Sequence, residues 1–381
     1  MLSRSTLAYA RPAIAAFAAM GLLWGTFAAA MPDLKAMLGV DERELGLLVF
    51  CTPLAAISAM LVAPAFGTAV GRVALPVSVA LMALAFALPG QASVWWLFPL
   101  AMACAGAATG LTDVLMNARV AAMETSRGLH LMNLAHAAYS FGYAGGAVLT
   151  GVMRGAGWGP GWVMGTMSLV GLGFAALSLE RDGRIDGLRK PRDGSAGRLG
   201  WVPVIGGGIV LIAFMTENAA EYWSALHIEK TLGGSPEQGA LGPAMLALTM
   251  GFARLGGQSL AGRVDAFTIL RWGAVIAAAG ALVVSQAWAP WVAYAGFFVM
   301  GVGASVLAPT AFSLVGQMSD DAARARAVAR ATLLGYLGYF VGPPLLGVIA
   351  GTFGLRFAFL WAACLVAMVF VLAPVLRRQR T

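Results

Sequence analysis

Apolar segments alternate with short polar ones along almost the whole chain. Twelve of the apolar segments are each long enough to cross a hydrocarbon layer roughly 30 Å thick. They lie at residues 13–31, 45–66, 74–90, 94–116, 131–153, 161–179, 202–224, 240–260, 268–288, 291–315, 328–350 and 355–376. Because backbone polar groups in lipid must pair within their own segment, runs of this length predict helices and not a β-barrel. The pattern predicts an all-α membrane protein of twelve transmembrane helices, the first of them retained and not cleaved as a signal peptide.

The basic residues support this count of helices. If the N-terminus is cytoplasmic, five of the 25 Lys and Arg residues fall outside, namely Lys35, Arg43, Arg154, Lys230 and Arg356, and 25 − 5 = 20 fall on the cytoplasmic side. A missed helix would reverse the sides of all later loops and scramble this asymmetry. We therefore expect a multi-pass protein with both termini cytoplasmic. Its short loops and its richness in Arg, Ala and Gly suggest a bacterial inner membrane.

Composition excludes several other classes of protein. Hydrophobic residues make up 60% of the chain and charged residues 11%, whereas a soluble domain carries about 25% charged residues. The net charge of +8 comes from Arg residues in short loops, without a basic tract interleaved with aromatics, so we expect no nucleic-acid partner. Cys51, Cys104 and Cys364 lack metal-ligand spacing, and no phosphate-binding GxxxxGK[ST] motif is present. We expect no metal or cofactor, and a monomer in the lipid bilayer.

The two halves of the chain resemble one another. The residues Gly142, Tyr143, Gly146 and Gly151 recur, each shifted by 196 positions, as Gly338, Tyr339, Gly342 and Gly347. The longest polar segment, 180–200, lies between the halves. A duplicated six-helix unit is therefore expected, with halves at 1–180 and 202–381 joined by a cytoplasmic linker at 181–201. The GxxxG spacing of Gly142/Gly146 and of Gly338/Gly342 predicts close helix packing.

Two loops carry a motif. Gly67-Thr-Ala-Val-Gly71-Arg72 follows the second predicted helix, and a segment running from Arg254 to Gly262-Arg263-Val-Asp265 follows the eighth. Both resemble the cytoplasmic gate motif Gly-x-x-x-Asp-Arg of the major facilitator superfamily, although Gly71 and Gly262 stand where the family has Asp. The segment Glu124-Thr-Ser-Arg127-Gly128 is similar to a further pattern of that family. The resemblance covers nearly the whole chain and implies two pseudo-symmetric six-helix halves. It also implies a gate that contains Arg72, Glu124, Arg127, Arg254, Arg263 and Asp265.

Three further segments narrow the resemblance to the fucose-permease-like and mostly uncharacterised bacterial branch of the superfamily. They are Asp113-Val-Leu-Met-Asn117, His130 to Gly146, and Glu217 to Leu226. Such a resemblance implies small polar solutes, for example sugars.

A few ionisable residues interrupt the apolar segments. An ionisable group in a membrane is costly and by default marks a functional site. Asp113 and Asn117 share one face of the fourth predicted helix, and Glu217, Asn218 and Glu221 lie in the seventh. Glu217 and Glu221 share a face, so their like charges favour the retention of a proton on one of them. The alternatives are a structural hydrogen-bonded pair for Asp113 with Asn117, and simple contact with outer water for Glu221.

Other polar and aromatic residues complete the predicted site. Asn133, His136 and Tyr139 line one face of the fifth predicted helix, and a histidine suits a proton relay, although a lone histidine is more often structural. Aromatic rings could stack on a solute, although most aromatic residues in membrane helices serve packing or the interface. The candidates for such stacking are Trp24, Phe27, Trp223, Tyr336 and Tyr339.

These features predict a secondary active transporter and not an enzyme. A small polar solute, sugar-like or an organic acid, would bind between the halves and be carried by alternating access. Proton-coupled symport through Glu217, Asp113, His136 or Glu221 is the expected energy source. The alternative is a proton-driven exporter of amphipathic compounds. A membrane enzyme or sensor finds no support in any catalytic triad or signalling domain.

Overall fold

The computed structural model describes residues 4–185, 188, 200–257, 264–320 and 323–380, and the regular structure in these ranges is helical throughout. The first group of helices is α1 (Arg4–Leu38), α2 (Glu42–Leu48), α3 (Cys51–Val70), α4 (Ala74–Ala87), α5 (Phe98–Arg127), α6 (Met132–Gly155) and α7 (Pro160–Leu177). The second group is α8 (Val202–Leu226), α9 (Pro236–Gly257), α10 (Ala266–Gln286), α11 (Pro290–Ala304), α12 (Leu307–Gln317), α13 (Arg324–Phe353) and α14 (Leu355–Arg377).

These helices match the predicted apolar segments. Within the described ranges, nine helical segments are long and apolar enough to cross a membrane, and one of them, Glu42–Gln91, is 50 residues long and holds two crossings. The more polar helices α6 and α9 complete the predicted set of twelve, in which α2 with α3 and α11 with α12 each form one interrupted crossing. The expected all-α, twelve-helix class is confirmed.

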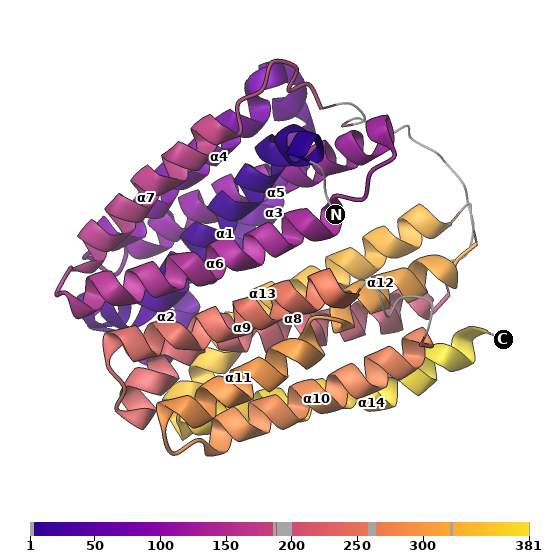
Figure 1. Cartoon of the computed structure of the whole chain (residues 1–381). Helices are drawn as coiled ribbons and strands as arrows, with labels where there is room; N and C mark the ends of the chain where they lie inside the picture. The colour runs from indigo at the N-terminus through magenta and orange to yellow at the C-terminus, as the bar shows by residue number, and fades with distance from the viewer. Residues whose placement is uncertain (1–3, 186–187, 189–199, 258–263, 321–322, 381) are drawn as a thin grey trace.

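The helices of each group pack mainly among themselves, and the groups lie side by side (Figure 1). Both chain termini lie at one end of the bundle. We call the opposite end, where α1 meets α2, α6 meets α7 and α8 meets α9, the distal end. The predicted boundaries of the halves stay predictions, and most of the predicted linker lies outside the described residues.

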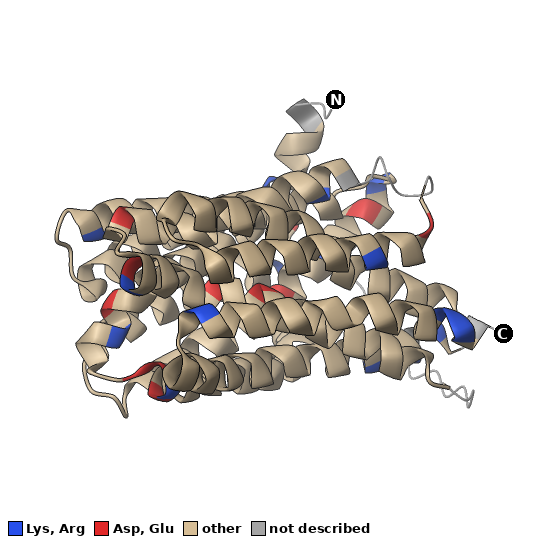
Figure 2. Cartoon of the chain, turned by 90° about the horizontal axis from the view of Figure 1, so that it is seen from below, with Lys and Arg blue, Asp and Glu red and all other residues tan. Residues whose placement is uncertain are grey.

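The outside of the bundle suits lipid. Large apolar side chains are exposed there, for example Leu61 at 79% and Trp162 at 76%. Charged residues gather near the ends of the helices, and only a few lie in the middle of the bundle (Figure 2). Since water would not cover such a surface favourably, the exposed apolar belt is the expected contact with hydrocarbon.

The predicted close packing at the GxxxG positions is confirmed on α6. A Cβ added to Gly146 would lie 2.9 Å from Cα of Leu22 on α1 and would overlap the Leu22 carbonyl, and Gly142 meets Ala18 in the same way. On α13, Gly338 similarly faces Leu211 on α8, 2.6 Å from its carbonyl oxygen. Only a hydrogen in place of a side chain permits helices to approach this closely.

A pair of alanine variants tests this packing. We expect Gly146→Ala to lower the Tm of the purified protein, because overpacking typically costs about 1–3 kcal/mol. The adjacent Gly145 has nothing within 4 Å of an added Cβ, so Gly145→Ala should leave Tm unchanged or raise it, since Ala favours a helix by about 1 kcal/mol over Gly. Equal Tm values for the two variants would contradict close packing of α1 on α6.

Candidate functional site

A cavity of about 310 Å³ lies between the two groups of helices. Residues of α1, α3, α5 and α6 line it from one side, and residues of α8, α9, α12 and α13 line it from the other. The sequence-predicted residues that line this cavity are Trp24, Asp113, His136, Tyr139, Glu217, Glu221, Arg254, Tyr336 and Tyr339. Helices far apart in the sequence thus bring most of the candidate binding and proton-coupling residues to one place.

Five predicted residues do not line the cavity but lie around it. The Asn117 amide donates hydrogen bonds to the Asp113 side-chain Oδ1 at 3.0 Å and to the Asp113 carbonyl at 2.9 Å. The fully buried Phe27 packs on Trp24 with ring centroids 5.7 Å apart. Asn133 is half-buried, and Asn218 and Trp223 are buried. A contact with solute is therefore a weaker prediction for these five than for the lining residues.

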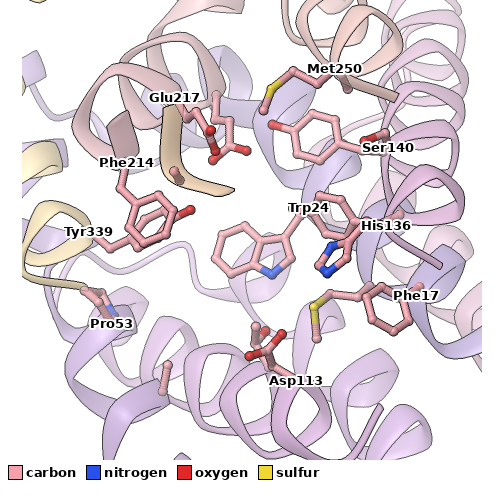
Figure 3. A pocket seen from close by; sticks show the side chains of 18 of the residues that line it. Phe17, Trp24, Pro53, Asp113, His136, Ser140, Phe214, Glu217, Met250 and Tyr339 are labelled. Atoms are coloured by element: carbon pink, nitrogen blue, oxygen red, sulfur yellow. The ribbon is translucent and has the colours of Figure 1, made fainter. Parts of the chain in front are cut away.

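The three carboxylates of the cavity come from both sides of it. Asp113 on α5 lies across the cavity from Glu217 on α8, with Trp24 between them in the view of Figure 3. Glu217 is only 7% exposed, yet its carboxylate makes no hydrogen bond or ion pair with the residues that the structure describes. Glu221, one turn further along α8, also lines the cavity. A buried carboxylate without a protein partner is available to a proton or a solute.

Arg254 is the basic side chain among the described residues that line the cavity. Its guanidinium donates to Ser140 Oγ at 3.3 Å, and no ion pair joins it to the carboxylates within the described part of the chain. The nearby His136 ring packs edge-on against Phe17, with centroids 5.0 Å apart. The resemblance assigned Arg254 to the gate, whereas the side chain faces the cavity.

Aromatic rings form two walls of the cavity. On the first, Trp24 contacts Phe86 at 5.1 Å and Tyr222 at 6.4 Å between ring centroids. On the second, Phe214 contacts Tyr339 at 4.7 Å and Tyr336 at 5.9 Å. Because Trp24 lies on α1 and Tyr222 on α8, the first wall already joins the two groups of helices. Such walls offer flat apolar faces with hydroxyl groups at their edges.

The remaining predicted gate residues lie near the end that carries the termini. Arg72 is exposed beside the turn after α3, and the Arg127 guanidinium lies 3.7 Å from the ring centroid of Tyr9. Glu124 accepts hydrogen bonds from the backbone N–H groups of Leu131 and Met132 and so fixes the turn between α5 and α6. Asp265 caps the N-terminus of α10 by accepting from the Thr268 N–H at 3.2 Å. Arg263 lies outside the described residues. A gate role for these residues stays a prediction.

An ion-pair network at the distal end was not anticipated from the sequence. Arg154, at the end of α6, has a side chain only 1% exposed and binds two carboxylates at once. It donates to Asp33 on α1 at 2.6 and 2.8 Å and to Glu229 after α8 at 2.7 and 2.9 Å, and it also donates to the Ala29 carbonyl at 2.7 Å. Since Glu229 belongs to the second group of helices, Arg154 links the two groups.

A second ion-pair cluster lies at the same end. Lys35 at the end of α1 pairs with Glu42 of α2 at 2.9 Å, and Lys230 after α8 approaches the same carboxylate at 3.7 Å. Isolated charges near the ends of apolar segments were the sequence signal for both clusters. Such charges do not identify their own partners, and the sequence analysis used Lys35, Arg154 and Lys230 only to assign the topology.

Comparison with known proteins gives the family. The model of the Major Facilitator Superfamily matches residues 13–285 and 205–381, which together span nearly the whole chain. The chain belongs to the Major Facilitator Superfamily. Members of this superfamily are transporters and not enzymes, so the predicted resemblance to the superfamily and the prediction of a transporter are both confirmed, whereas the narrower branch stays a prediction.

Individual relatives within the superfamily agree with this assignment. An uncharacterised MFS-type transporter of Yersinia pestis is 29% identical over 369 residues, which cover 95% of this chain and 94% of that protein. The solved structure of the nucleoside transporter NupG has a TM-score of 0.76 at 10% identity, covering 98% of each chain. The E. coli fucose:proton symporter FucP has a TM-score of 0.56 at 17% identity, covering 95% of this chain and 98% of FucP. At these identities the solved structures show the fold alone. This superfamily member is a multi-pass membrane transporter.

Proposed function

We propose that this chain is a proton-coupled secondary transporter that carries a small polar solute across a bacterial inner membrane as a monomer. The observation that carries the proposal is the central cavity, into which both groups of helices contribute carboxylates: Asp113 from α5, and Glu217 and Glu221 from α8. A site between two halves is what alternating access requires, because the halves can rock around a bound solute.

The contacts at the distal end support one state of that cycle, the state that is closed to the outside. If the termini are cytoplasmic, the distal end is the outer side, and the Arg154 bridge to Asp33 and Glu229 holds that side closed. Opening toward the outside must break the Arg154–Glu229 pair, whereas the Arg154–Asp33 pair can persist within its own half. The network would then favour the state that is closed to the outside and would set its population.

The proton coupling rests on Glu217. An ionised carboxylate is expensive in a site shielded from water, and no described side chain pairs with this one. A proton that enters with the solute removes this cost, so that the loaded carrier can close around a neutral site. Asp113, Glu221 and His136 line the same cavity and are further candidates for carrying the proton.

The charges of the cavity favour a solute that donates hydrogen bonds. Sugar-like hydroxyl groups and amino groups can donate to Asp113, Glu217 and Glu221. An organic acid would instead bring a further negative charge toward three carboxylates, with Arg254 alone among the described lining residues to offset it. The cavity therefore supports the sugar-like alternative better than the organic acid.

A proteoliposome assay tests the coupling. A panel of monosaccharides, amines and organic acids is applied to vesicles that contain the protein and a pH-sensitive dye. We expect at least one solute to drive proton movement, an imposed pH gradient to stimulate its uptake about tenfold or more, and Glu217→Gln to lose this stimulation. Uptake that ignores the gradient, together with full activity of Glu217→Gln, would lead us to abandon proton coupling.

The second candidate function is proton-driven export of amphipathic compounds. The aromatic walls around Trp24 and Phe214 favour it, because flat apolar faces bind hydrophobic bodies without strict shape requirements. Cargo range discriminates the two functions. Expression of an exporter should raise resistance to several unrelated toxins, whereas a permease with one polar solute should leave such resistance unchanged.

A further inference from the structure

The cavity contains more negative than positive groups. Asp113, Glu217 and Glu221 face it, and Arg254 is the matching guanidinium among the described lining residues. His136 is the remaining titratable nitrogen base there and lies against Phe17. With the carboxylates ionised, the described lining carries an excess of two negative charges even after Arg254 is counted.

The side chains next to these carboxylates offset only part of their negative charge. Asp113 accepts one hydrogen bond from Asn117, a neutral amide, and Glu217 is more than nine-tenths buried with no partner in the described ranges. Arg254 lies within electrostatic range of Glu217 and Glu221, but its described hydrogen bond goes to Ser140, and within the described residues it forms no ion pair with either carboxylate. A buried negative charge with this little compensation favours a cation from outside the protein.

Three residues that line the cavity carry hydroxyl groups without a hydrogen-bond partner in the described part of the chain. The Tyr143 hydroxyl and the Oγ1 atoms of Thr52 and Thr109 are buried without a hydrogen-bond partner in the part of the chain that the structure describes. All three residues line the cavity. Buried polar atoms normally have partners, so a small rotation of these side chains toward the cavity would let a polar solute supply the missing hydrogen bonds.

Four tyrosines lie near Glu221. Tyr139, Tyr143, Tyr222 and Tyr339 all lie within electrostatic range of it. The rings of Tyr139 and Tyr143 are 6.1 Å apart between centroids, and Tyr339 lies opposite on α13. Aromatic faces attract ammonium groups through their negative quadrupole, most strongly where water is excluded. A carboxylate among such rings is suited to an amine nitrogen.

We propose that the transported solute is a small organic cation with a protonated amine, whose ammonium binds Glu221 among the tyrosines while Glu217 carries the coupled proton. The body of the solute lies between Trp24 and the Phe214–Tyr339 wall, and its hydroxyl or other polar groups reach Asp113, Tyr143 or Thr109. This inference rests on the proposed transport function and names the chemical class of its solute.

A matched series of probes isolates the effect of the solute's charge on binding. Benzylamine, which is protonated at neutral pH, benzyl alcohol and benzoate share one skeleton and differ mainly in the charge of a single group. Binding is measured on the purified full-length protein by thermal shift and by competition with a transported solute. We expect benzylammonium to raise Tm and to bind at least about tenfold more tightly than the alcohol, and benzoate to bind most weakly.

Carboxamide variants link the effect to the carboxylates. Glu221→Gln should weaken benzylammonium binding about tenfold or more while leaving benzyl alcohol binding almost unchanged. Glu237→Gln is the matched control, because Glu237 lies exposed at the start of α9 and outside the cavity. That variant should bind all three probes like the unmodified protein.

The outcomes separate the solute class from the transport proposal. Tighter binding of benzyl alcohol or benzoate, equal binding of all three probes, or no benzylammonium binding up to its solubility limit would overturn the amine proposal. Solute-driven proton movement in the vesicle assay would then still stand. Conversely, charge-selective binding of benzylammonium with uptake that ignores the pH gradient would overturn proton coupling and leave the solute class intact.

Discussion

Replacing Arg154 by methionine is expected to open the distal end of the bundle and to lower the stability of the folded protein. The substitution leaves the Asp33 and Glu229 carboxylates close together without the buried guanidinium that both bind. Breaking a buried ion pair by removal of one partner typically costs about 3–5 kcal/mol. Much of that cost can be relieved if the two groups of helices separate at the distal end, since Asp33 lies on α1 of the first group and Glu229 follows α8 of the second.

Thiol labelling measures this opening. In a background without Cys51, Cys104 and Cys364, a reporter cysteine is introduced by Ala240→Cys, where α9 faces Gly151 of α6 at the closed distal end. We expect a membrane-impermeant maleimide, applied from the distal side, to label the reporter at least about tenfold faster in the Arg154→Met variant. A tenfold shift of the opening equilibrium corresponds to about 1.4 kcal/mol.

Two further variants keep the Arg154 prediction testable if Arg154→Met folds poorly. Glu229→Gln weakens only the bond between the halves and retains the Arg154–Asp33 pair, so it should fold and label at an intermediate rate. Arg43→Met is the matched control, because Arg43 is exposed and distal, and its replacement should not change labelling. Labelling that is equal in all variants would show that the network does not hold the distal end closed.

Replacing Gly347 by valine is expected to hold the distal end open by steric force. Where α2 meets α13, a Cβ on Gly347 would lie 2.7 Å from the Glu42 carbonyl oxygen and 3.1 Å from Cα of Gly46. A Cβ on Gly46 would in turn lie 2.5 Å from the Pro343 carbonyl oxygen. Real Cβ atoms do not approach backbone this closely, so the halves must move apart. We expect transport to fall at least about tenfold, because the closed state is required in every cycle.

The Gly347→Val variant distinguishes an opening of the distal end from a loss of folding stability. The same reporter at position 240 should label faster, while the protein still purifies as a folded monomer, because α13 keeps its packing on α8. Gly351, one turn further along α13, would place a Cβ no closer than 3.3 Å to Arg43, so Gly351→Val should have a smaller effect. Unchanged labelling in Gly347→Val would contradict a steric role for this crossing.

The sequence predicted the fold well for a physical reason. In lipid each helix must satisfy its own backbone groups, so every crossing leaves an apolar run of a defined length that can be read without knowledge of its neighbours. The predicted segments accordingly correspond to the described helices, even where α2 and α3 or α11 and α12 are interrupted. The sequence also indicated a close approach of another helix to α6, because Gly142 and Gly146 share a face, whereas the identity of that helix, α1, came from the structure.

The candidate site was predictable in part. Rare polar residues such as Asp113, Glu217 and His136 stand out against apolar helices, and most of those selected line one cavity. The face of a helix follows from its period, but the neighbour of that face does not. Asn117 could thus be assigned to the face of Asp113, whereas its orientation toward the Asp113 oxygens and away from the cavity depends on packing.

The hydropathy pattern alone was therefore enough to identify the helical class, the number of crossings and the residues too polar to face lipid without a reason. Which charges meet depends on how the helices pack. Arg154 lies 121 residues from Asp33 and 75 from Glu229, and Arg254 faces Ser140 across 114 residues. An ion pair requires two groups within a few ångströms, and a hydropathy pattern carries no information about distances between helices. The bridge between the halves at the distal end, and the surplus of carboxylates in the cavity, arise from that packing.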